Sequence, residues 1–286
     1  MSKNIDKEVL SFYKKLPFNI YDNIDKACEN IKKLNLKKTY PFLVDPIIES
    51  STIIDIGCGG GWLVNSIAHK YKKKILGLDF NSIAINFAKK VSQKLGNNIE
   101  YEVDNIFGYT PKSKFDLILS LGVLHHTRDC LKALDKICKF GEKKSKIFIG
   151  LYHKQGRKPF LEFVDSLKNL SEKEKFDEYK KIHKLDNDLH QKSWFRDQVL
   201  HPHESLHDLD EVLSIFKKNN YKFIGTSINV FNTNDSMDEI LKKEKNLYKY
   251  GKDKIEKKIY YPGFFIVGGQ KNELWKTWKW RFSKRI

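Results

Sequence analysis

Residues 52–61 read TIIDIGCGGG, a β-branched apolar run that meets an acidic residue and then a turn with alternating glycines. Thr52 to Ile56 have the continuous apolar character of a buried parallel strand, because such a strand is covered on both faces. The next segment, GWLVNSIAHKY, repeats its apolar residues at helical spacing. A glycine-rich turn between a strand and a helix lets the backbone approach a ligand and directs the helix N-terminus at it. This stretch therefore predicts a nucleotide-type cofactor site.

The spacing of the glycines separates two kinds of cofactor. A dinucleotide fingerprint needs G-x-G-x-x-G, and here the third glycine would fall on Trp62. The chain instead reads Asp-x-Gly-x-Gly-x-Gly from Asp55. This pattern resembles the first motif of the class I S-adenosylmethionine (SAM) methyltransferases. The resemblance implies that Asp55 interacts with the ammonium group of SAM. It also implies that the amino acid portion of SAM lies on the glycine turn, namely Gly57, Cys58, Gly59 and Gly61.

Two further apolar runs end in acidic residues. Residues 74–80, KILGLDF, contain Asp79 near their end, and an acidic residue after the second strand of a doubly wound sheet can accept hydrogen bonds from ribose hydroxyls. Residues 99–107, IEYEVDNIF, predict a third strand that ends in Asp104. The resemblance adds further cofactor contacts, on these segments and on the next strand: Phe80 at the adenine face, Asp104 at the adenine amino group, and Asn105, Leu121 and His125.

The segment KFDLILSLGVLHHTRD, 114–129, predicts the fourth strand, followed by two histidines. Four motifs in order at βα spacing resemble class I methyltransferases through residue 152, particularly small-molecule and quinone-pathway enzymes with V-L-H-H after strand four. His126 is a candidate general base, since an unperturbed imidazole pKa of about 6.5 suits proton removal at neutral pH. Alternatively, one or both histidines only shape the cofactor pocket. Alignment alone accelerates a one-step displacement, so a dedicated base is not required.

The order of these patterns predicts an α/β fold with a doubly wound, seven-stranded, mostly parallel sheet and a helical cap inserted after strand five. Residues 146–152 predict the fifth strand, and residues 221–230 and 260–270 the last two, which the resemblance makes an antiparallel edge pair. The predicted parts are an N-terminal helical lid (1–50), a SAM-binding core (51–152), a helical cap with the acceptor site (153–207), the C-terminal part of the core sheet with a helical insertion near 235–250 (208–271), and a basic aromatic tail (272–286).

The segments after strand five supply candidates for the acceptor site, because loops after the strands line the ligand crevice of this fold. Arginine is scarce in the chain, and a guanidinium binds a carboxylate or phosphate bidentately. Two arginines flanked by histidines thus indicate an anionic acceptor, although hydrogen-bonded packing is the alternative for each residue. The candidate catalytic residues are His126, Tyr152 and His153, and the candidate substrate-binding residues are Arg157, Arg196, His201 and His203.

The segment HPHESLH, 201–207, contains His203-Glu204-x-x-His207, the pattern of a zinc protease. That pattern binds zinc only inside a continuous helix, where both imidazoles share a face. Here a capping box, Asp208-x-x-Glu211, places the start of the next helix after both histidines. A polar loop beside the acceptor is therefore expected, and no metal site.

The formal net charge of +17 raises the question of a nucleic-acid partner. Only five of the 53 basic residues are arginine, and the lysines are spread along the chain. Phosphate and base recognition favours arginine and clustered charge, so a nucleic-acid partner is not expected. The tail 274–286 mixes tryptophans with basic residues; membrane contact is an alternative, but packing on the protein itself is expected.

Together these patterns predict a SAM-dependent methyltransferase that acts by direct displacement on a small, anionic or hydroxylated acceptor. An RNA- or protein-directed methyltransferase and a non-catalytic SAM-binding protein remain the alternatives. The four cysteines show no paired spacing, and the chain has neither a secretory signal nor an apolar run long enough to span a membrane. A cytoplasmic location is therefore expected. Neither the acceptor nor the oligomeric state can be assigned from the sequence.

Overall fold

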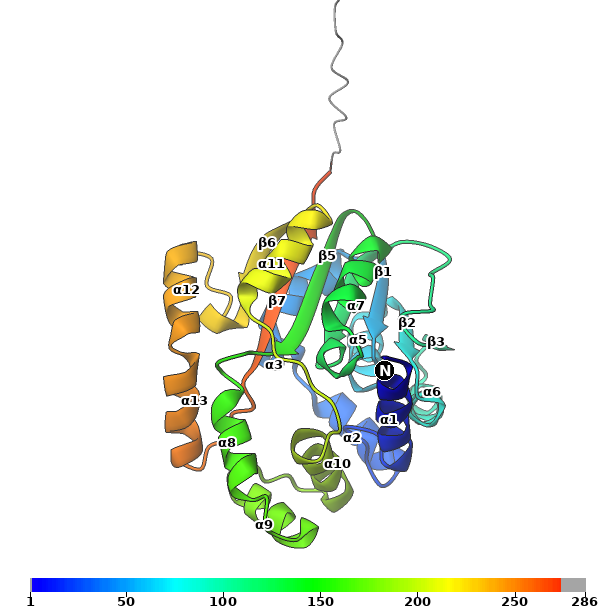
Figure 1. The fold of residues 1–286 in the computed structure, drawn as a ribbon. Helices are drawn as coiled ribbons and strands as arrows, with labels where there is room; N and C mark the ends of the chain where they lie inside the picture. The colour runs from blue at the N-terminus through cyan, green and yellow to red at the C-terminus, as the bar shows by residue number, and fades with distance from the viewer. Residues whose placement is uncertain (1, 274–286) are drawn as a thin grey trace, which may run out of the picture.

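A seven-stranded sheet forms the centre of the molecule, with its strands in the order β3-β2-β1-β4-β5-β7-β6 (Figure 1). The computed structural model describes residues 2–273. Strands β1 to β5 run parallel, and β7 runs antiparallel to both β5 and β6. The expected sheet is confirmed. The strands are β1 (Thr52–Ile56), β2 (Lys74–Asp79), β3 (Glu100–Val103), β4 (Phe115–Leu121), β5 (Gly141–Tyr152), β6 (Tyr221–Thr226) and β7 (Phe264–Lys271).

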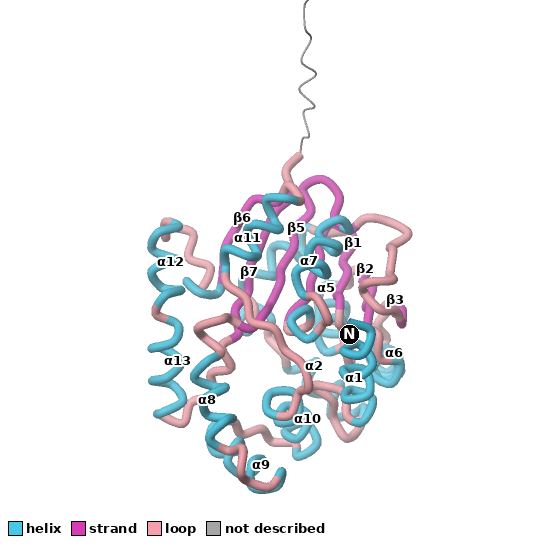
Figure 2. The backbone as a smooth tube through the Cα atoms, viewed as in Figure 1, coloured by secondary structure: helices cyan, strands magenta, loops and turns pink. Residues whose placement is uncertain are grey.

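Helices cover the sheet and extend beyond its lower edge (Figure 2). Their bounds are α1 (Ser2–Lys15), α2 (Ile24–Lys33), α3 (Leu36–Thr39), α4 (Val44–Glu49), α5 (Trp62–Tyr71), α6 (Ser82–Leu95), α7 (Cys130–Ile137), α8 (Lys158–Ser166), α9 (Glu172–Ile182), α10 (Asp188–Val199), α11 (Leu209–Lys218), α12 (Met237–Lys245) and α13 (Leu247–Glu256). In the part of the chain that the structure describes, no helix combines the length and apolar character needed to cross a membrane.

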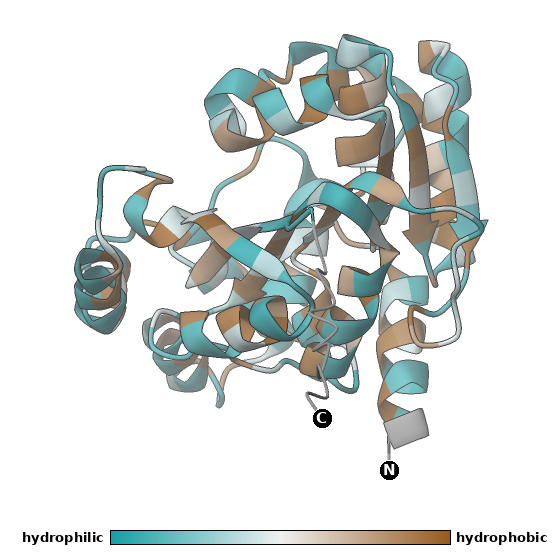
Figure 3. Ribbon diagram, turned by 90° about the horizontal axis from the view of Figure 1, so that it is seen from above, coloured by the Kyte–Doolittle hydropathy of each residue, from teal (hydrophilic) through white to brown (hydrophobic). Residues whose placement is uncertain are grey.

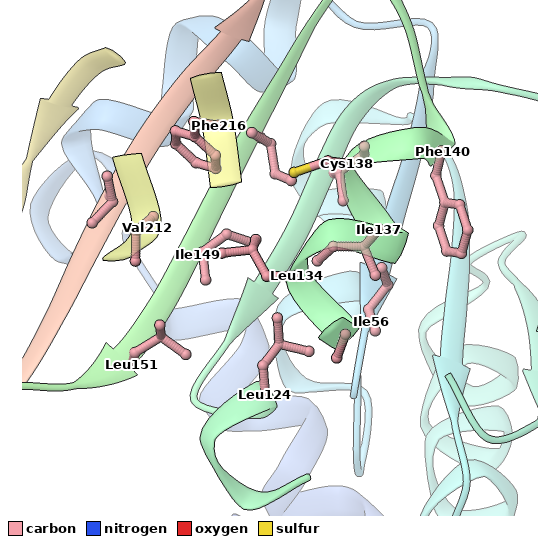
Figure 4. Close-up of a cluster of buried hydrophobic side chains, with 14 of the residues drawn as sticks. Ile56, Leu124, Leu134, Ile137, Cys138, Phe140, Ile149, Leu151, Val212 and Phe216 are labelled. Carbon is pink, nitrogen blue, oxygen red and sulfur yellow. The ribbon is translucent and has the colours of Figure 1, made fainter. Parts of the chain in front are cut away.

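Both faces of the sheet are covered by buried apolar residues. Figure 3 colours the hydrophobic segments of the strands and helices brown. On one face, α7 and α11 pack over β5, with Leu134, Phe216 and Ile149 among the contacting residues (Figure 4). On the other face, α4 and α5 supply Ile47 and Ile67. Burying one such side chain contributes about 1.5–3 kcal/mol, so these layers fix the strands whose ends carry the site.

Asn81 is the N-cap of α6. The predicted capping box at the start of α11 is confirmed: it is formed by Asp208 and Glu211. The segment with the zinc-protease pattern therefore precedes the helix and is not helical itself. Within residues 2–273, no group of three or more His, Cys, Asp or Glu side chains is arranged to hold a metal ion.

Several element boundaries differ from the sequence prediction. The third strand ends at Val103, one residue before its predicted end at Asp104, and the Asn105 side chain then accepts the Phe107 N–H. The sixth strand ends at Thr226, whose side chain caps a short 3-10 helix. The insertion near 235–250 is a pair of helices, α12 and α13, that extends to Glu256.

The connection between β5 and α11 holds three helices, α8, α9 and α10, the last of which the sequence did not indicate. Figure 1 shows this three-helix segment beyond the carboxyl ends of the parallel strands, near α1. It has its own apolar cluster, which includes Phe160, Tyr179 and Phe195. The division of the chain into lid, core and cap stays a prediction. The tail segment 274–286, for which packing on the protein is expected and membrane contact is the alternative, lies outside the described residues.

Candidate active site

A cavity of about 470 Å³ lies at the carboxyl ends of β1, β2 and β4. The turns after these strands form its floor. Tyr13 of α1, Phe18 of the following loop and Trp194 of α10 form part of its wall. The volume is within the range of small-molecule sites, about 300–1,000 Å³. The cavity is thus built where a doubly wound sheet binds its ligands.

The glycine turn after β1 needs its glycines. Gly57 has a φ of 75°, and a Cβ atom there would lie 2.3 Å from the side chain of Val123. The backbone N–H of Gly59 donates a 2.8 Å hydrogen bond to Asp79 Oδ2, which joins this turn to the end of β2. The Asn81 N–H donates to the other oxygen, Asp79 Oδ1, also at 2.8 Å. The turn and the carboxylate therefore form one rigid cradle.

The buried carboxylates of Asp55 and Asp79 line the cavity. Burial raises the pKa of Asp55 to about 8 and the pKa of Asp79 to about 6, because ionised groups lose solvation there. Asp6 and Asp104 also line the cavity. Among residues 2–273, no lysine or arginine lines it. The wall is therefore suited to a ligand that brings positive charge.

Helix α1 is fastened over one end of the cavity by polar contacts. Asp6 on α1 forms an ion pair with Arg128 and accepts a 3.1 Å hydrogen bond from Asn105 Nδ2. Asn81 Nδ2 donates to the backbone carbonyl of Tyr13 at 3.1 Å. Hence the N-terminal helix belongs to the site and is not an appendage.

A second polar group lies at the β4 side of the cavity. His126 follows β4, and its Nδ1 lies 2.9 Å from the carbonyl oxygen of His203. Its Nε2 lies 4.0 Å from Asp197 Oδ1, which accepts a 2.6 Å hydrogen bond from the Tyr13 hydroxyl. The His201 ring lies over the His126 ring at 3.8 Å between centroids. This group combines residues from α1, α10 and two loops.

Similarity to known proteins fits this fold and cavity. Residues 47–177 match a family model described as a methyltransferase domain. The chain contains a class I SAM-dependent methyltransferase domain. The matched residues run from α4 to α9 and include the glycine turn, the strand-end aspartates and His126.

The curated proteins that this methyltransferase domain is similar to are named for different acceptors. The chain is 30% identical over 105 residues to a probable (S)-tetrahydroprotoberberine N-methyltransferase 2 of Papaver bracteatum, covering 36% of this chain and 29% of that protein. It is 26% identical over 187 residues to a tRNA U34 carboxymethyltransferase of Campylobacter hominis, covering 58% of this chain and 63% of that protein. The chain thus spans less than two thirds of the length of these relatives.

A solved structure matches the methyltransferase fold over nearly the whole chain. It is magnesium protoporphyrin IX methyltransferase (ChlM) from Synechocystis PCC 6803 with bound SAH, with a TM-score of 0.53 and 12% sequence identity. The match covers 95% of this chain and 96% of that chain. At this identity the similarity shows the fold and not the acceptor.

The structure of the methyltransferase domain places most of the expected cofactor residues on the cavity wall. Gly61 and His125 are not on it. Gly61 is the N-cap of α5 and packs toward Ala88, and His125 is buried against the Tyr152 ring. The expected residues that do line the cavity are Asp55, Gly57, Cys58, Gly59, Asp79, Phe80, Asp104, Asn105 and Leu121.

The expected acceptor contact of Arg157 is not supported by its position. The guanidinium is fully buried outside the cavity wall, and its Nε and Nη2 donate to the Glu204 carboxylate at 3.1 and 2.8 Å. Its Nη1 donates to Gln198 Oε1 at 3.0 Å. The N–H donors of Arg157 that were expected to bind an anionic acceptor are therefore already hydrogen-bonded to Glu204 and Gln198.

Other expected acceptor residues also lie behind the wall. His153 pairs with Glu244 at 2.8 Å, and Tyr152 lies under the Arg157 guanidinium at 3.8 Å. The Arg196 guanidinium lies over the Phe12 ring. Of the candidate catalytic and substrate-binding residues, only His126 lines the cavity. The candidates that do not line it are Tyr152, His153, Arg157, Arg196, His201 and His203.

Sequence reasoning missed several residues of the wall. Tyr13 and Phe18 lie in the predicted lid and Trp194 lies in the predicted cap, but none of the three is among the site residues predicted from the sequence. Trp194 packs against Phe18 at 4.8 Å between ring centroids, and its Nε1 donates to His190 Nε2 at 2.8 Å. The sequence signal that could have indicated this part of the wall is the aromatic pair Trp194 and Phe195 in the segment 193–200.

Proposed function

We propose that this protein transfers the methyl group of SAM to a small acceptor bound in the same cavity, by direct displacement. One observation carries the proposal. The glycine turn is hydrogen-bonded to Asp79 on a wall with four aspartates, of which Asp6 is paired with Arg128, and within the described residues no lysine or arginine lines that wall. SAM has a sulfonium, an ammonium and one carboxylate, so it brings net positive charge to this wall.

Strand order supports the placement of the cofactor. Asp55 lies near the end of β1, Asp79 is the last residue of β2, and Asp104 directly follows β3; these three strands are neighbours on one side of the sheet centre. A cofactor held by all three would extend toward β3. The part of the cavity beside β4, where His126 lies, would then remain for the acceptor.

The acceptor we propose is small and hydroxylated rather than anionic. The anionic expectation depended on Arg157 and Arg196, and the first is neutralised by Glu204 while neither lines the cavity. Aromatic side chains such as Phe18 and Trp194 instead form much of the wall. Such a surface favours an apolar or ring-bearing compound.

Calorimetry and metabolite profiling test this function. We expect SAM and its product S-adenosylhomocysteine (SAH) to bind, and SAH to raise the melting temperature, because a ligand of the folded state stabilises that state. A preference for NAD over SAH would refute the proposal. Incubation of metabolite extracts with isotopically labelled SAM, with and without the protein, should label a small molecule. Tight SAH binding without labelling of any small molecule, protein or RNA would instead indicate a SAM-binding protein without transferase activity.

A further inference from the structure

Aromatic side chains from four separate segments line the cavity. The segments are the loop after α1, the residue after α3, and the helices α5 and α10. We call these residues the aromatic cage: Phe18, Tyr21, Tyr40, Trp62 and Trp194. The rings of Trp194 and Phe18 lie 4.8 Å apart between centroids with their planes inclined by 55°, and those of Tyr40 and Trp62 lie 6.2 Å apart at 77°. Rings inclined in this way present faces and edges to the same volume from several directions.

The position of the Trp194 ring is fixed by its indole N–H. Nε1 donates to His190 Nε2 at 2.8 Å and to Asn19 Oδ1 at 3.3 Å. Asn19 follows Phe18 in the loop after α1 and has a φ of 54°, a left-handed conformation that asparagine adopts more readily than most residues. These bonds join the loop to α10. The aromatic cage is therefore ordered before a ligand enters, which lowers the entropic cost of binding.

The cavity has an excess of carboxylates that the cofactor does not balance. One of its four aspartates is paired with Arg128, and three remain: Asp55, Asp79 and Asp104. SAM carries a sulfonium, an ammonium and a carboxylate, so it brings a single net positive charge. A cationic cofactor favours the ionised form of the aspartates beside it. The cavity with bound SAM therefore keeps net negative charge.

The side chains of the wall supply no positive charge of their own. Among the described residues, no lysine or arginine lines the cavity. Two histidines do line it, but burial lowers the pKa of His126 to about 3 and the pKa of His190 to about 4. Both imidazoles are thus neutral at neutral pH. A second cation in the cavity would meet carboxylates and aromatic rings, and no like charge from the protein wall.

On the basis of the proposed function, we propose that the aromatic cage binds a cationic nitrogen of the acceptor, which is then a hydroxylated ammonium compound. A cation near an aromatic face is attracted by the negative side of the ring quadrupole, most strongly for tryptophan, and alkyl groups on the nitrogen fit the same apolar rings. Trp62 and Trp194 therefore determine the specificity. An anion would be repelled by the rings and by the carboxylates, and a neutral compound would gain only contact area.

Choline and 3,3-dimethylbutan-1-ol test the charge, because the two share their shape and hydroxyl and differ in one positive charge. Each is titrated by calorimetry into the SAH complex of the full-length protein. We expect choline to bind about fivefold or more tightly than the neutral alcohol, and benzoate not to bind. Equal affinities, or no binding of choline, would overturn this inference while SAH binding stands. Failure of SAH to bind would instead refute the proposed function on which the inference rests.

Substitutions at Trp194 test the aromatic face. Trp194→Phe and Trp194→Leu both remove the indole N–H, and only the first keeps a ring, so a difference between them reports the ring alone. We expect Trp194→Leu to abolish the preference for choline over the neutral alcohol and Trp194→Phe to retain most of it. Tyr250→Leu, which removes an exposed ring from α13, is the control and should leave the preference unchanged. Equal losses in both Trp194 variants would contradict the role of the face.

The sulfonium of SAM is the competing occupant of the aromatic cage. SAM and SAH differ in this charge, so the ratio of their Kd values measures its contribution. We expect the same ratio in wild type and in Trp194→Leu, because the cage serves the acceptor. A Trp194→Leu protein that loses affinity for SAM and keeps it for SAH would overturn the assignment. Unchanged SAH binding also shows that the variant is folded, and the comparison of choline with the neutral alcohol on wild type needs no variant.

Discussion

The Gly59 N–H and the Asp79 carboxylate are joined by a 2.8 Å hydrogen bond, which fixes the turn after β1 to the end of β2. A second bond, from the Asn81 N–H, holds the other carboxylate oxygen and thereby links the start of α6 to the same group. Asp79 consequently shapes the floor of the cavity as well as facing into it. Its loss should affect the cofactor before it affects the overall fold.

We expect Asp79→Ala to weaken SAH binding by about 1–3 kcal/mol, because ribose hydroxyls and the Gly59 N–H would lose their acceptor. Isothermal titration calorimetry measures the change. Asp45→Ala on the exposed side of α4 is the matched control and should bind SAH as the wild type does. Equal affinities for wild type and Asp79→Ala would place the ribose elsewhere.

Stability should depend on pH through Asp55 and Asp79. Their pKa values are about 8 and 6 in the folded protein, against about 3.9 in an unfolded chain. Between these limits the folded state binds more protons than the unfolded state, so this contribution to the free energy of unfolding falls as pH rises. The Asp55→Asn variant, which cannot ionise, should therefore gain stability relative to wild type between about pH 5 and pH 8. Parallel melting curves at both pH values would contradict this expectation.

SAM binding should release protons, because a cationic ligand favours the ionised carboxylates and lowers the pKa values of Asp55 and Asp79. We expect the measured binding enthalpy at neutral pH to differ between phosphate and Tris buffers, whose ionisation enthalpies differ. The difference should shrink in Asp55→Asn. An enthalpy independent of buffer would show that both aspartates are already ionised in the free protein.

Arg157 should matter for stability and not for cofactor affinity. Breaking its buried pair with Glu204 costs about 3–5 kcal/mol, so Arg157→Met should lower the melting temperature while the Kd for SAH stays the same. The exposed Lys168→Met is the control, with an expected change within about 0.5 kcal/mol. Adding Glu204→Gln should recover part of the loss, because no unpaired charge then remains. A stable Arg157→Met protein that cannot transfer methyl groups would restore the acceptor role.

Binding to RNA should be weak and non-specific. Among the described residues no lysine or arginine lines the cavity, so attraction between tRNA and the surface lysines should carry no sequence preference and should fall steeply with salt. Fluorescence anisotropy with labelled tRNA at two salt concentrations measures this. Sub-micromolar, sequence-selective binding at physiological salt would favour the RNA-directed alternative.

The fold, and the strand-end residues of the cavity where we propose that the cofactor binds, could be predicted because their sequence signals are local. The run 52–61 contains strand, turn and helix start, and each further strand carries its own acidic end at Asp79 and Asp104. The end of the sixth strand was predicted less well. The segment 221–230 has the composition of a strand, but β6 ends at Thr226, where the side chain accepts the Ile228 N–H and caps a short 3-10 helix.

The acceptor end could not be predicted because it depends on contacts between distant segments. The scarcity of arginine drew attention to Arg157, but the sequence does not show that Glu204 would neutralise it. That glutamate comes from the same HPHESLH segment whose zinc pattern was rejected. Tyr13 and Asp197 gave no joint signal, because only folding brings the first helix against α10.

The contact between Tyr13 and Asp197 also determines when the site forms during protein synthesis. The two residues are 184 positions apart in the chain. At about 5–20 residues per second, a ribosome needs about 10–40 s to make the second after the first. During this interval Tyr13 of α1 has no Asp197 to bond to, because α10 has not yet been synthesised. The glycine turn and Asp79 can therefore form their contact in the nascent chain before the part of the cavity beside α10 forms.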